Sequence, residues 1–258
     1  IQARSSSTRL PDKVSKIILG ETLIERIYKI SNMSKNSSES VVLTSESNSD
    51  ENFCSLMNKL SINYFRADLD NVFIRYKKYL IKNKFTNGFF VRLTADCPLL
   101  DYGIIDQTID EHIANNNDYT TTDHGGSFPL GQSVEVVNVD KFLSIDENQL
   151  DSLDKEHVTR YIWKRPELFK CGKITYVNKT NLNTKNVRLT IDEEEDFTLV
   201  ESIIENLKYR DDKFPNLYDI LNFLNKNMKL LEINMHVEQV SVDWIIGNYL
   251  LKELNFLC

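Results

Sequence analysis

Apolar strands alternate with amphipathic helices through the first half of the chain, and this order limits the possible folds more than any other feature. Residues 21–31, 53–60 and 72–82 carry apolar side chains at helical spacing. Short apolar runs typical of strands separate these helices, at 1–3, 41–43, 62–65 and 88–93. Because helices that cross a sheet join parallel strands, the order predicts an α/β fold with a doubly wound, mostly parallel sheet. Such folds bind ligands beyond the carboxyl ends of their strands.

The second half of the chain departs from this order. After a helix around residues 104–113, short β-rich runs at 119–121 and 133–137 indicate a small antiparallel or edge insertion, within residues 119–140. Two more strands are predicted at 173–177 and 187–191, and helices at 197–207, 217–224 and 242–254. No linker rich in proline or serine divides the sequence. We therefore expect one domain over residues 1–240 and a helical tail over 241–258, packed on the core or on a partner.

The composition argues against several classes of protein. The 258 residues are 41% hydrophobic, with a formal net charge of −7. That charge argues against a general nucleic-acid coat and against a protein that binds anionic membranes. No run approaches the ~18 apolar residues that a membrane span requires. The four cysteines lack metal-like spacing, which favours free thiols in the cytoplasm. No signal peptide is recognisable, and because the chain begins inside a predicted strand we expect a short N-terminal segment to be missing.

The loop after the first strand is rich in cations and hydroxyl groups. Residues 3–13 read Ala-Arg-Ser-Ser-Ser-Thr-Arg-Leu-Pro-Asp-Lys. Arg and Lys can offset phosphate charge while hydroxyl groups and turn amides donate hydrogen bonds, so at this edge of the sheet the loop is predicted to hold a polyphosphate. Taken alone, such a composition is more often a solvated turn. The loop matches neither a Walker loop nor a dinucleotide-binding fingerprint.

Two apolar runs far apart in the sequence end in aspartate. Asp96 follows the fourth strand, and Asp192 follows residues 187–191. Mg²⁺ takes one or two carboxylates and fills its other positions with phosphate oxygens and water. Together with the cationic loop, the two aspartates therefore predict a site for a nucleotide and Mg²⁺. The alternative is that each aspartate only caps the next helix.

Five strings, in order, resemble the cytidylyltransferases of the spore coat polysaccharide biosynthesis protein F type, which are related to the CMP-sialate and CMP-Kdo synthetases. They are residues 1–14, Arg-Leu-Thr-Ala-Asp-Cys-Pro-Leu-Leu-Asp at 92–101, Glu-His-Val-Thr at 156–159, Leu-Thr-Ile-Asp with Glu-Asp within 189–196, and residues 230–239. The resemblance implies a Rossmann-like, GT-A-like nucleotidyltransferase fold. It also implies an enzyme that transfers CMP from CTP to an acidic sugar or polyol-type acceptor and releases pyrophosphate, in surface polysaccharide or glycoconjugate biosynthesis.

The resemblance further implies roles for individual residues. The triphosphate would be held by Arg4, Ser6, Ser7, Arg9 and Lys13. Asp96 and Asp192 would hold Mg²⁺, and with Arg4 and Lys13 they form the predicted catalytic set. Arg66 matches an arginine that the relatives place near the base, where its planar donors could read cytosine; an ion pair with Asp68 or Asp70 is the alternative.

Five side chains are candidates for contact with the acceptor: Gln132, Glu135, His157, Arg160 and Arg188. His157 could donate a hydrogen bond to an acidic group, or its neutral form could take a proton from an attacking hydroxyl. A capping or core-edge histidine is the alternative. Because the relatives pair as dimers, we also expect a homodimer, with residues 119–137 as a plausible interface.

Three residues depart from the pattern of the family. Asp12 replaces a usual glycine, Ser5 a hydrophobic residue that is often Met, and Ser133 an aspartate. An acidic Asp12 would oppose a phosphate unless its side chain turned away. These departures leave open a catalytically silent scaffold for a biosynthetic partner. A glycosyltransferase that uses a nucleotide sugar is the other alternative, although no Asp-x-Asp string ends the fourth strand.

Overall fold

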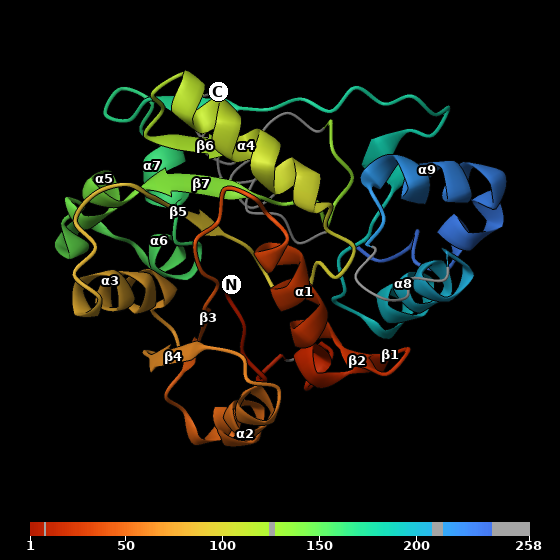
Figure 1. The fold of residues 1–258 in the computed structure, drawn as a ribbon, viewed down its shortest axis with the longest axis horizontal. Coiled ribbons are helices and arrows are strands. Elements are labelled where there is room, and N and C mark those ends of the chain that lie inside the picture. Colours follow the sequence, from red (N-terminus) through yellow and green to blue (C-terminus); the bar gives the residue numbers. More distant parts are fainter. Residues whose placement is uncertain (8, 124–126, 208–213, 239–258) are drawn as a thin grey trace, which may run out of the picture.

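The computed structural model describes residues 1–7, 9–123, 127–207 and 214–238, and its short strands lie between layers of helices (Figure 1). The strands are β1 (Ile17–Ile18), β2 (Glu21–Thr22), β3 (Val42–Ser45), β4 (Tyr64–Ala67), β5 (Phe89–Arg92), β6 (Tyr119–Thr121), β7 (Glu135–Asn138) and β8 (Cys171–Lys173). The helices are α1 (Leu23–Asn32), α2 (Glu51–Lys59), α3 (Val72–Lys82), α4 (Tyr102–Ala114), α5 (Val139–Leu143), α6 (Ser152–Glu156), α7 (Arg160–Trp163), α8 (Glu194–Leu207) and α9 (Leu217–Lys226).

The opening residues lie between β3 and β5 and join the strands into a mixed, mostly parallel sheet. Gln2 makes parallel bridges to Leu43 in β3 and to Thr94, just beyond β5. β4 pairs in parallel with the far side of β3. On the other side of β5 the order is β7, β6 and β8, in which β6 and β8 are parallel. The α/β fold and the mostly parallel sheet therefore agree with the sequence prediction.

The antiparallel segment lies inside the sheet. Val136 of β7 is paired with Val91 of β5 on one side and with Thr120 of β6 on the other, and both pairings are antiparallel. The prediction of an antiparallel strand is thus confirmed, but its alternative as an edge strand is wrong. The physical reason is visible in the sequence, because Val136 and Val137 are both fully buried, as in a strand covered on both faces.

Two hydrophobic cores cover the two faces of the sheet. Val42 and Val136 pack in the core that includes side chains of α1, α2, α4, α8 and α9. Their neighbours Leu43 and Val137 pack in the other core, with side chains of α3, α5 and α7. Successive side chains of a strand point to opposite faces, so each strand contributes to both cores. Figure 1 shows α3 and α5 at the left of the sheet and α1, α8 and α9 at the right.

Two of the helices begin at a polar residue whose side chain accepts a hydrogen bond from a backbone amide in the first turn. Asn71 accepts a hydrogen bond from the amide of Ile74 at 3.0 Å and begins α3, whose bounds are those predicted. Asp101 accepts from the amide of Gly103 at 2.8 Å and begins α4. The residue that caps α4 is therefore Asp101 and not Asp96.

Several elements differ from the predictions. β8 begins at Cys171 rather than at residue 173; Gly172 permits this, because a Cβ atom there would lie 2.0 Å from the amide nitrogen of Asn117. Residues 187–191 form no regular strand, only a bridge between Arg188 and Leu130. The hairpin of β1 and β2 and the short helices α5 and α6 were not predicted. The predicted helix over 242–254 and the tail lie outside the described residues. Within the described ranges, no helix is long and apolar enough to cross a bilayer.

Candidate active site

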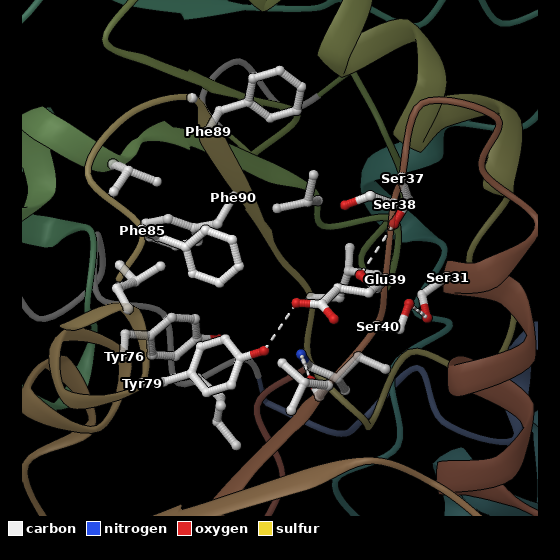
Figure 2. A pocket seen from close by; sticks show the side chains of 18 of the residues that line it. Ser31, Ser37, Ser38, Glu39, Ser40, Tyr76, Tyr79, Phe85, Phe89 and Phe90 are labelled. Atoms are coloured by element: carbon white, nitrogen blue, oxygen red, sulfur yellow. Dashed lines mark hydrogen bonds between the residues drawn. The ribbon is translucent and has the colours of Figure 1, made fainter. Parts of the chain in front are cut away.

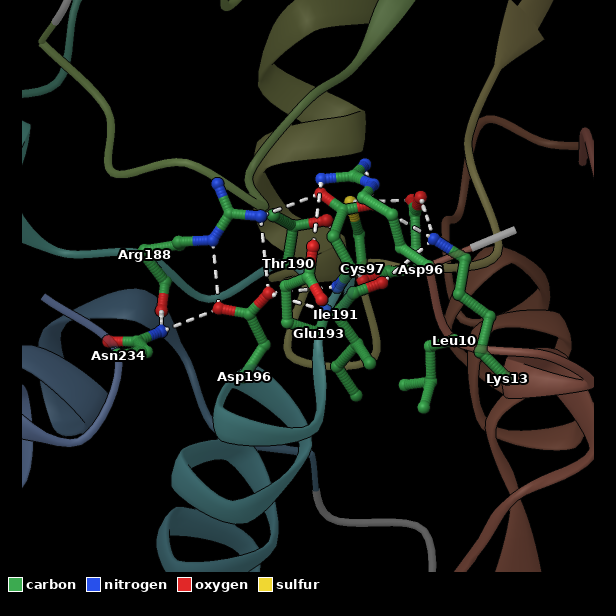
Figure 3. Close-up of polar contacts among 12 residues, drawn as sticks. Leu10, Lys13, Asp96, Cys97, Arg188, Thr190, Ile191, Glu193, Asp196 and Asn234 are labelled. Carbon is green, nitrogen blue, oxygen red and sulfur yellow. Dashed lines mark hydrogen bonds and ion pairs between the residues drawn. The ribbon is translucent and has the colours of Figure 1, made fainter. Parts of the chain in front are cut away.

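The two predicted metal ligands meet on one lysine at the carboxyl edge of the sheet. The Nζ of Lys13 donates to Oδ2 of Asp96 at 2.9 Å, to Oδ1 of Asp192 at 3.0 Å and to the carbonyl of Ile191 at 2.8 Å. The amide of Ile191 also donates to the carbonyl of Asp96 at 2.8 Å, which joins the two segments through their backbones. Figure 3 shows Lys13 and Asp96 facing each other across this site. Because both carboxylates contact one nitrogen atom, they are close enough to share a cation.

The contacts with Lys13 keep the site charged. Burial favours the neutral acid of Asp96, but attraction and a hydrogen bond from Lys13 outweigh it and hold the pKa of Asp96 below its usual value. Burial also disfavours the ammonium of Lys13, yet Asp96 and Asp192 outweigh that effect and raise the pKa of Lys13. The site thus offers carboxylate oxygens, which Mg²⁺ prefers as ligands, beside a permanent cation.

A second, buried carboxylate, that of Asp196, lies beside Arg188 and Asn234 (Figure 3) and fixes the position of Asp192. Arg188 donates to Oδ2 of Asp192 at 2.7 Å and to Oδ1 of Asp196 at 2.8 Å. Oδ2 of Asp196 accepts from the amides of Asp192 at 2.9 Å and Glu193 at 3.0 Å, and Oδ1 accepts from Asn234 at 2.8 Å. Arg188 was predicted to contact the acceptor, but here it holds two aspartates. The sequence analysis did not predict the roles of Asp196 and Asn234. Their only sequence signal was that they belong to the family-like strings within residues 189–196 and 230–239.

Of the predicted phosphate ligands, Lys13 and Arg9 contact the two aspartates directly. Arg9 forms an ion pair with Oδ1 of Asp192 at 2.8 Å. The Oγ of Ser7 accepts from the amide of Leu10 at 3.4 Å. The hydroxyl of Ser6 is buried and has no hydrogen-bond partner in the described chain. Arg4 is exposed, and its side chain makes no hydrogen bond or ion pair with any described residue. Ser6 and Arg4 therefore keep hydrogen-bonding capacity that a phosphate could use.

Arg66 reaches from β4 to the end of β3. Its guanidinium donates to the carbonyls of Ser45 at 3.0 Å and Ser47 at 3.1 Å, and it pairs with Glu51 at 2.7 Å. The alternative ion pair with Asp68 or Asp70 is therefore wrong. Arg66 lies at the same edge of the sheet as the aspartates and steadies the loop that follows β3.

Four of the five predicted acceptor residues, all except His157, are buried, and the polar atoms of Gln132 and Glu135 have partners in the fold. The Nε2 of Gln132 donates to the carbonyl of Leu99 at 2.7 Å, and its Oε1 accepts from the amide of Asp101 at 3.0 Å; Gln132 is 1% exposed. The carboxylate of Glu135 binds three side chains, namely Arg92 in an ion pair, Tyr119 at 2.6 Å and Thr159. Burial favours the neutral acid of Glu135, but the ion pair with Arg92 outweighs it and lowers the pKa.

A comparison with protein families identifies the chain, since the family model for cytidylyltransferases matches residues 1–237. The chain belongs to the cytidylyltransferase family. It is 34% identical over 247 residues to an uncharacterized protein of Methanocaldococcus jannaschii, covering 93% of this chain and 95% of that protein. It is 29% identical to the spore coat polysaccharide biosynthesis protein SpsF of Bacillus subtilis, covering 88% of this chain and 93% of SpsF.

A solved structure agrees with this assignment. The cytidylyltransferase from Leptospira borgpetersenii serovar Hardjo-bovis is 25% identical and superposes with a TM-score of 0.80, covering 93% of this chain and 96% of that one. The resemblance found in the sequence and the nucleotidyltransferase fold are therefore confirmed. This cytidylyltransferase is a CTP-dependent nucleotidyltransferase.

The departures from the family pattern have structural explanations in this cytidylyltransferase. Asp12 has a φ of 52°, in the left-handed region that favours the usual glycine, and its side chain is exposed. Ser133 donates to Oδ1 of Asp123 at 2.6 Å, so a carboxylate from the end of β6 lies beside the position where the family usually has an aspartate. Ser133 therefore fits the fold, whereas Asp12 keeps the backbone conformation of a glycine at the cost of strain.

His157 and Arg160 lie at the junction between α6 and α7. Arg160 is buried and binds Asp151 at 2.8 Å and Asp154 at 2.5 Å, the two residues that cap α6. The ring of His157 is half-buried, and burial lowers its pKa, so it is neutral near pH 7. The next residue, Val158, is fully buried with a φ of 42°, a strained conformation for a β-branched side chain. Of the pair, His157 is the one suited to proton transfer.

A cavity of about 420 Å³ lies at the opposite edge of the sheet from the aspartates (Figure 2). It is lined by Val41 and Gly88, next to the amino ends of β3 and β5, and by Tyr79 of α3, whose hydroxyl donates to Glu39 at 3.2 Å. Neither Asp96 nor Asp192 lines it. This cavity is therefore separate from the site at the carboxyl edge.

Asp96 and Asp192 are the residues best placed to hold a metal ion. No group of three or more His, Cys, Asp or Glu side chains suited to a metal is found in the described part of the chain. A pair of carboxylates suits Mg²⁺ when phosphate oxygens and water complete its coordination. The donor set thus fits an ion that arrives with a nucleotide.

Proposed function

We propose that this chain transfers CMP from CTP to an acidic sugar or polyol-type acceptor and releases pyrophosphate, with Mg²⁺ as its cofactor. The observation that carries the proposal is the meeting of Asp96, Asp192 and Lys13 beside the cationic opening loop. SpsF is by its name a protein of spore coat polysaccharide biosynthesis, and this likeness supports a role in surface polysaccharide or glycoconjugate assembly.

Asp96 and Asp192 would hold Mg²⁺, which supplies positive charge to the phosphate oxygens when bound. The ammonium of Lys13 now lies between the carboxylates, where a cation is required. With the nucleotide present, Lys13 turns toward the phosphates, because their charge then competes with that of the aspartates. Arg188 and Asp196 keep Asp192 in place during this exchange.

The remaining steps follow from the groups around the site. An acceptor oxygen forms a bond to the α-phosphorus while the bond from that phosphorus to the pyrophosphate oxygen breaks. Arg4, Arg9 and Lys13 offset the charge that develops on the departing pyrophosphate. A hydroxyl acceptor releases its proton to a base, for which the neutral ring of His157 is the candidate. Arg66 keeps two unused N–H groups with which it contacts the base.

We further propose that the protein works in the cytoplasm as a homodimer. Cys54, Cys97 and Cys171 are free thiols, as a reducing compartment favours. Residues 119–137 were predicted as the interface, but β6 and β7 within this segment are buried inside the sheet, so these two strands cannot contact a partner. Sedimentation of the purified protein at several concentrations tests the dimer, and a monomer at every concentration would contradict it.

Pyrophosphate release tests the proposed reaction. The protein is incubated with CTP, Mg²⁺ and a panel of acidic sugars, sugar phosphates and aminosugar acids. We expect Asp96→Asn to lower turnover about a hundredfold or more, since a neutral amide is a poor ligand for Mg²⁺. Asp70→Asn, at an exposed aspartate near the end of β4, is the control and should retain full turnover. Wild-type turnover in Asp96→Asn, or failure of the wild type to bind any nucleoside triphosphate, would refute the proposal.

A further inference from the structure

Asp50 is a fully buried carboxylate at the start of α2 that forms no ion pair with any described residue. Instead it accepts hydrogen bonds from the amide of Ser5 at 2.8 Å, the hydroxyl of Ser5 at 2.6 Å, the hydroxyl of Thr44 at 2.9 Å, the amide of Ser45 at 3.1 Å and the hydroxyl of Ser45 at 2.5 Å. Burial favours its neutral form, but these donors outweigh burial and lower the pKa of Asp50. A buried charge with this many donors holds its surroundings in one arrangement.

The donors come from two segments that are far apart in the sequence. Thr44 and Ser45 belong to β3, whereas Ser5 belongs to the opening loop. The carbonyl of Ser5 in turn accepts from the amides of Ser7 at 2.8 Å and Asp12 at 3.2 Å. Asp50 thus fixes Ser5, and Ser5 fixes both sides of the loop that ends at Lys13.

Ser5 is unsuited to bind a ligand directly. The residue is 6% exposed, and its hydroxyl lies within 2.8 Å of both a carboxylate oxygen of Asp50 and the carbonyl of Ser49. This is one of the positions at which the chain departs from its family, where the usual residue is hydrophobic. The hydroxyl group therefore gives this chain a contact that the usual residue cannot make.

We propose that Asp50 and Ser5 are positioning residues that hold the opening loop in the shape that binds the triphosphate of CTP. The inference rests on the proposed function of that loop. Neither residue touches the nucleotide; both act through the backbone that carries Arg4, Ser6 and Lys13. Without the anchor, the loop spends part of its time in other conformations, and the apparent Kd for CTP equals the intrinsic Kd divided by the fraction of molecules that remain competent.

Two matched variants separate loop positioning from a general effect on stability. Ser5→Ala and Thr44→Val each remove one buried hydroxyl donor from the same carboxylate, but only Ser5 belongs to the loop. We expect similar decreases in the thermal unfolding temperature for both. Calorimetric titration with CTP and Mg²⁺ should give a Kd about tenfold higher for Ser5→Ala and an unchanged Kd for Thr44→Val. At saturating CTP, kcat of Ser5→Ala should remain close to that of the wild type.

Hydrogen exchange tests the anchor without nucleotide. The amides of Ser7 and Asp12 should exchange about tenfold faster in Ser5→Ala, and at the wild-type rate in Thr44→Val. Equal Kd values for wild type and Ser5→Ala would overturn the inference while leaving the proposed function intact. Equal increases of the Kd in Ser5→Ala and Thr44→Val would do the same. If the wild type does not bind CTP, the proposed function fails, and with it the assignment of the anchored loop to a triphosphate.

Discussion

Asp12 adopts a backbone conformation that its side chain does not favour. With a φ of 52° it lies in the left-handed region, where an L-residue other than glycine crowds its own carbonyl oxygen. In this conformation the amide of Asp12 donates to the carbonyl of Ser5 at 3.2 Å and closes the opening loop. Asp12 therefore adds both backbone strain and a negative charge beside the proposed phosphate ligands.

We expect Asp12→Gly to raise the free energy of unfolding by about 1 kcal/mol, because glycine relieves the strain. The same variant should bind CTP a few-fold more tightly, because a negative charge near the phosphates is lost. Asp12→Ala separates the two effects, since it removes the charge but keeps the strain. Denaturant unfolding and CTP titration measure them. Equal stability of the two variants would show that the backbone at residue 12 is not strained.

At the scale of residues, the sequence predicted which charged side chains gather at the site, but it did not predict which side chains they pair with. It predicted one site for Asp96, Asp192 and the loop with Lys13, and these residues do meet, although the run before Asp192 forms only a bridge and not the predicted strand. It did not predict the ion pairs that Arg160 and Arg188 form with nearby aspartates. Tertiary packing sets the side-chain directions on which these ion pairs depend. The sequence analysis also counted Ser5 as support for a silent scaffold, although Ser5 is bound to Asp50.

At the scale of elements, one carboxylate connects four segments. Glu135 at the start of β7 binds Arg92 of β5, Tyr119 of β6 and Thr159 beside α7. Helix positions were predictable because their periodicity is local. The interior place of β7 was not, because strand pairing is chosen between residues distant in sequence. Glu135 therefore looked in the sequence like an accessible acceptor ligand.

We expect Glu135→Gln to lower the free energy of unfolding by about 3 kcal/mol or more, because the variant leaves the charge of Arg92 buried without its partner. Glu147→Gln is the matched control. Its carboxylate pairs with Lys77 at 3.1 Å but is 46% exposed, so its loss should change stability by less than about 1 kcal/mol. Denaturant unfolding measures both variants. Wild-type stability in Glu135→Gln together with weaker acceptor binding would contradict the structural role and support the predicted contact of Glu135 with the acceptor.

At the scale of the whole molecule, stability depends on keeping buried groups in one charge state. His112 is buried between Thr120 at 3.1 Å and Asn138 at 2.9 Å, and its burial lowers its pKa. Burial lowers the pKa of His157 in the same way. Asp50 and Asp96 instead stay charged, since hydrogen bonds or Lys13 lower their pKa values despite burial. Acid should therefore weaken the fold in two separate pH windows.

The histidine window comes first as the pH falls. The unfolded chain takes up protons on its histidines near pH ~6.5, whereas the folded protein takes them up on His112 and His157 only at lower pH. The unfolded state thus binds more protons below pH ~6.5, and the free energy of unfolding falls by at most about 1.4 kcal/mol per pH unit for each histidine. Protonation of Asp50 and Asp96 lowers the free energy of unfolding further, but only below pH ~4.

Substitution of His112 separates the two windows. His112→Gln keeps polar atoms that can bond Thr120 and Asn138 but cannot titrate, so the slope of unfolding free energy between pH 6.5 and 5 should become shallower. The loss below pH ~4 should persist, because it belongs to the carboxylates. His236→Gln, at a ring that is 63% exposed, is the control for replacing a histidine by glutamine. Denaturant unfolding at several pH values measures all three proteins. An unchanged slope in His112→Gln would mean that His112 is protonated equally in the folded and unfolded states, and that its burial does not set the acid limit of the fold.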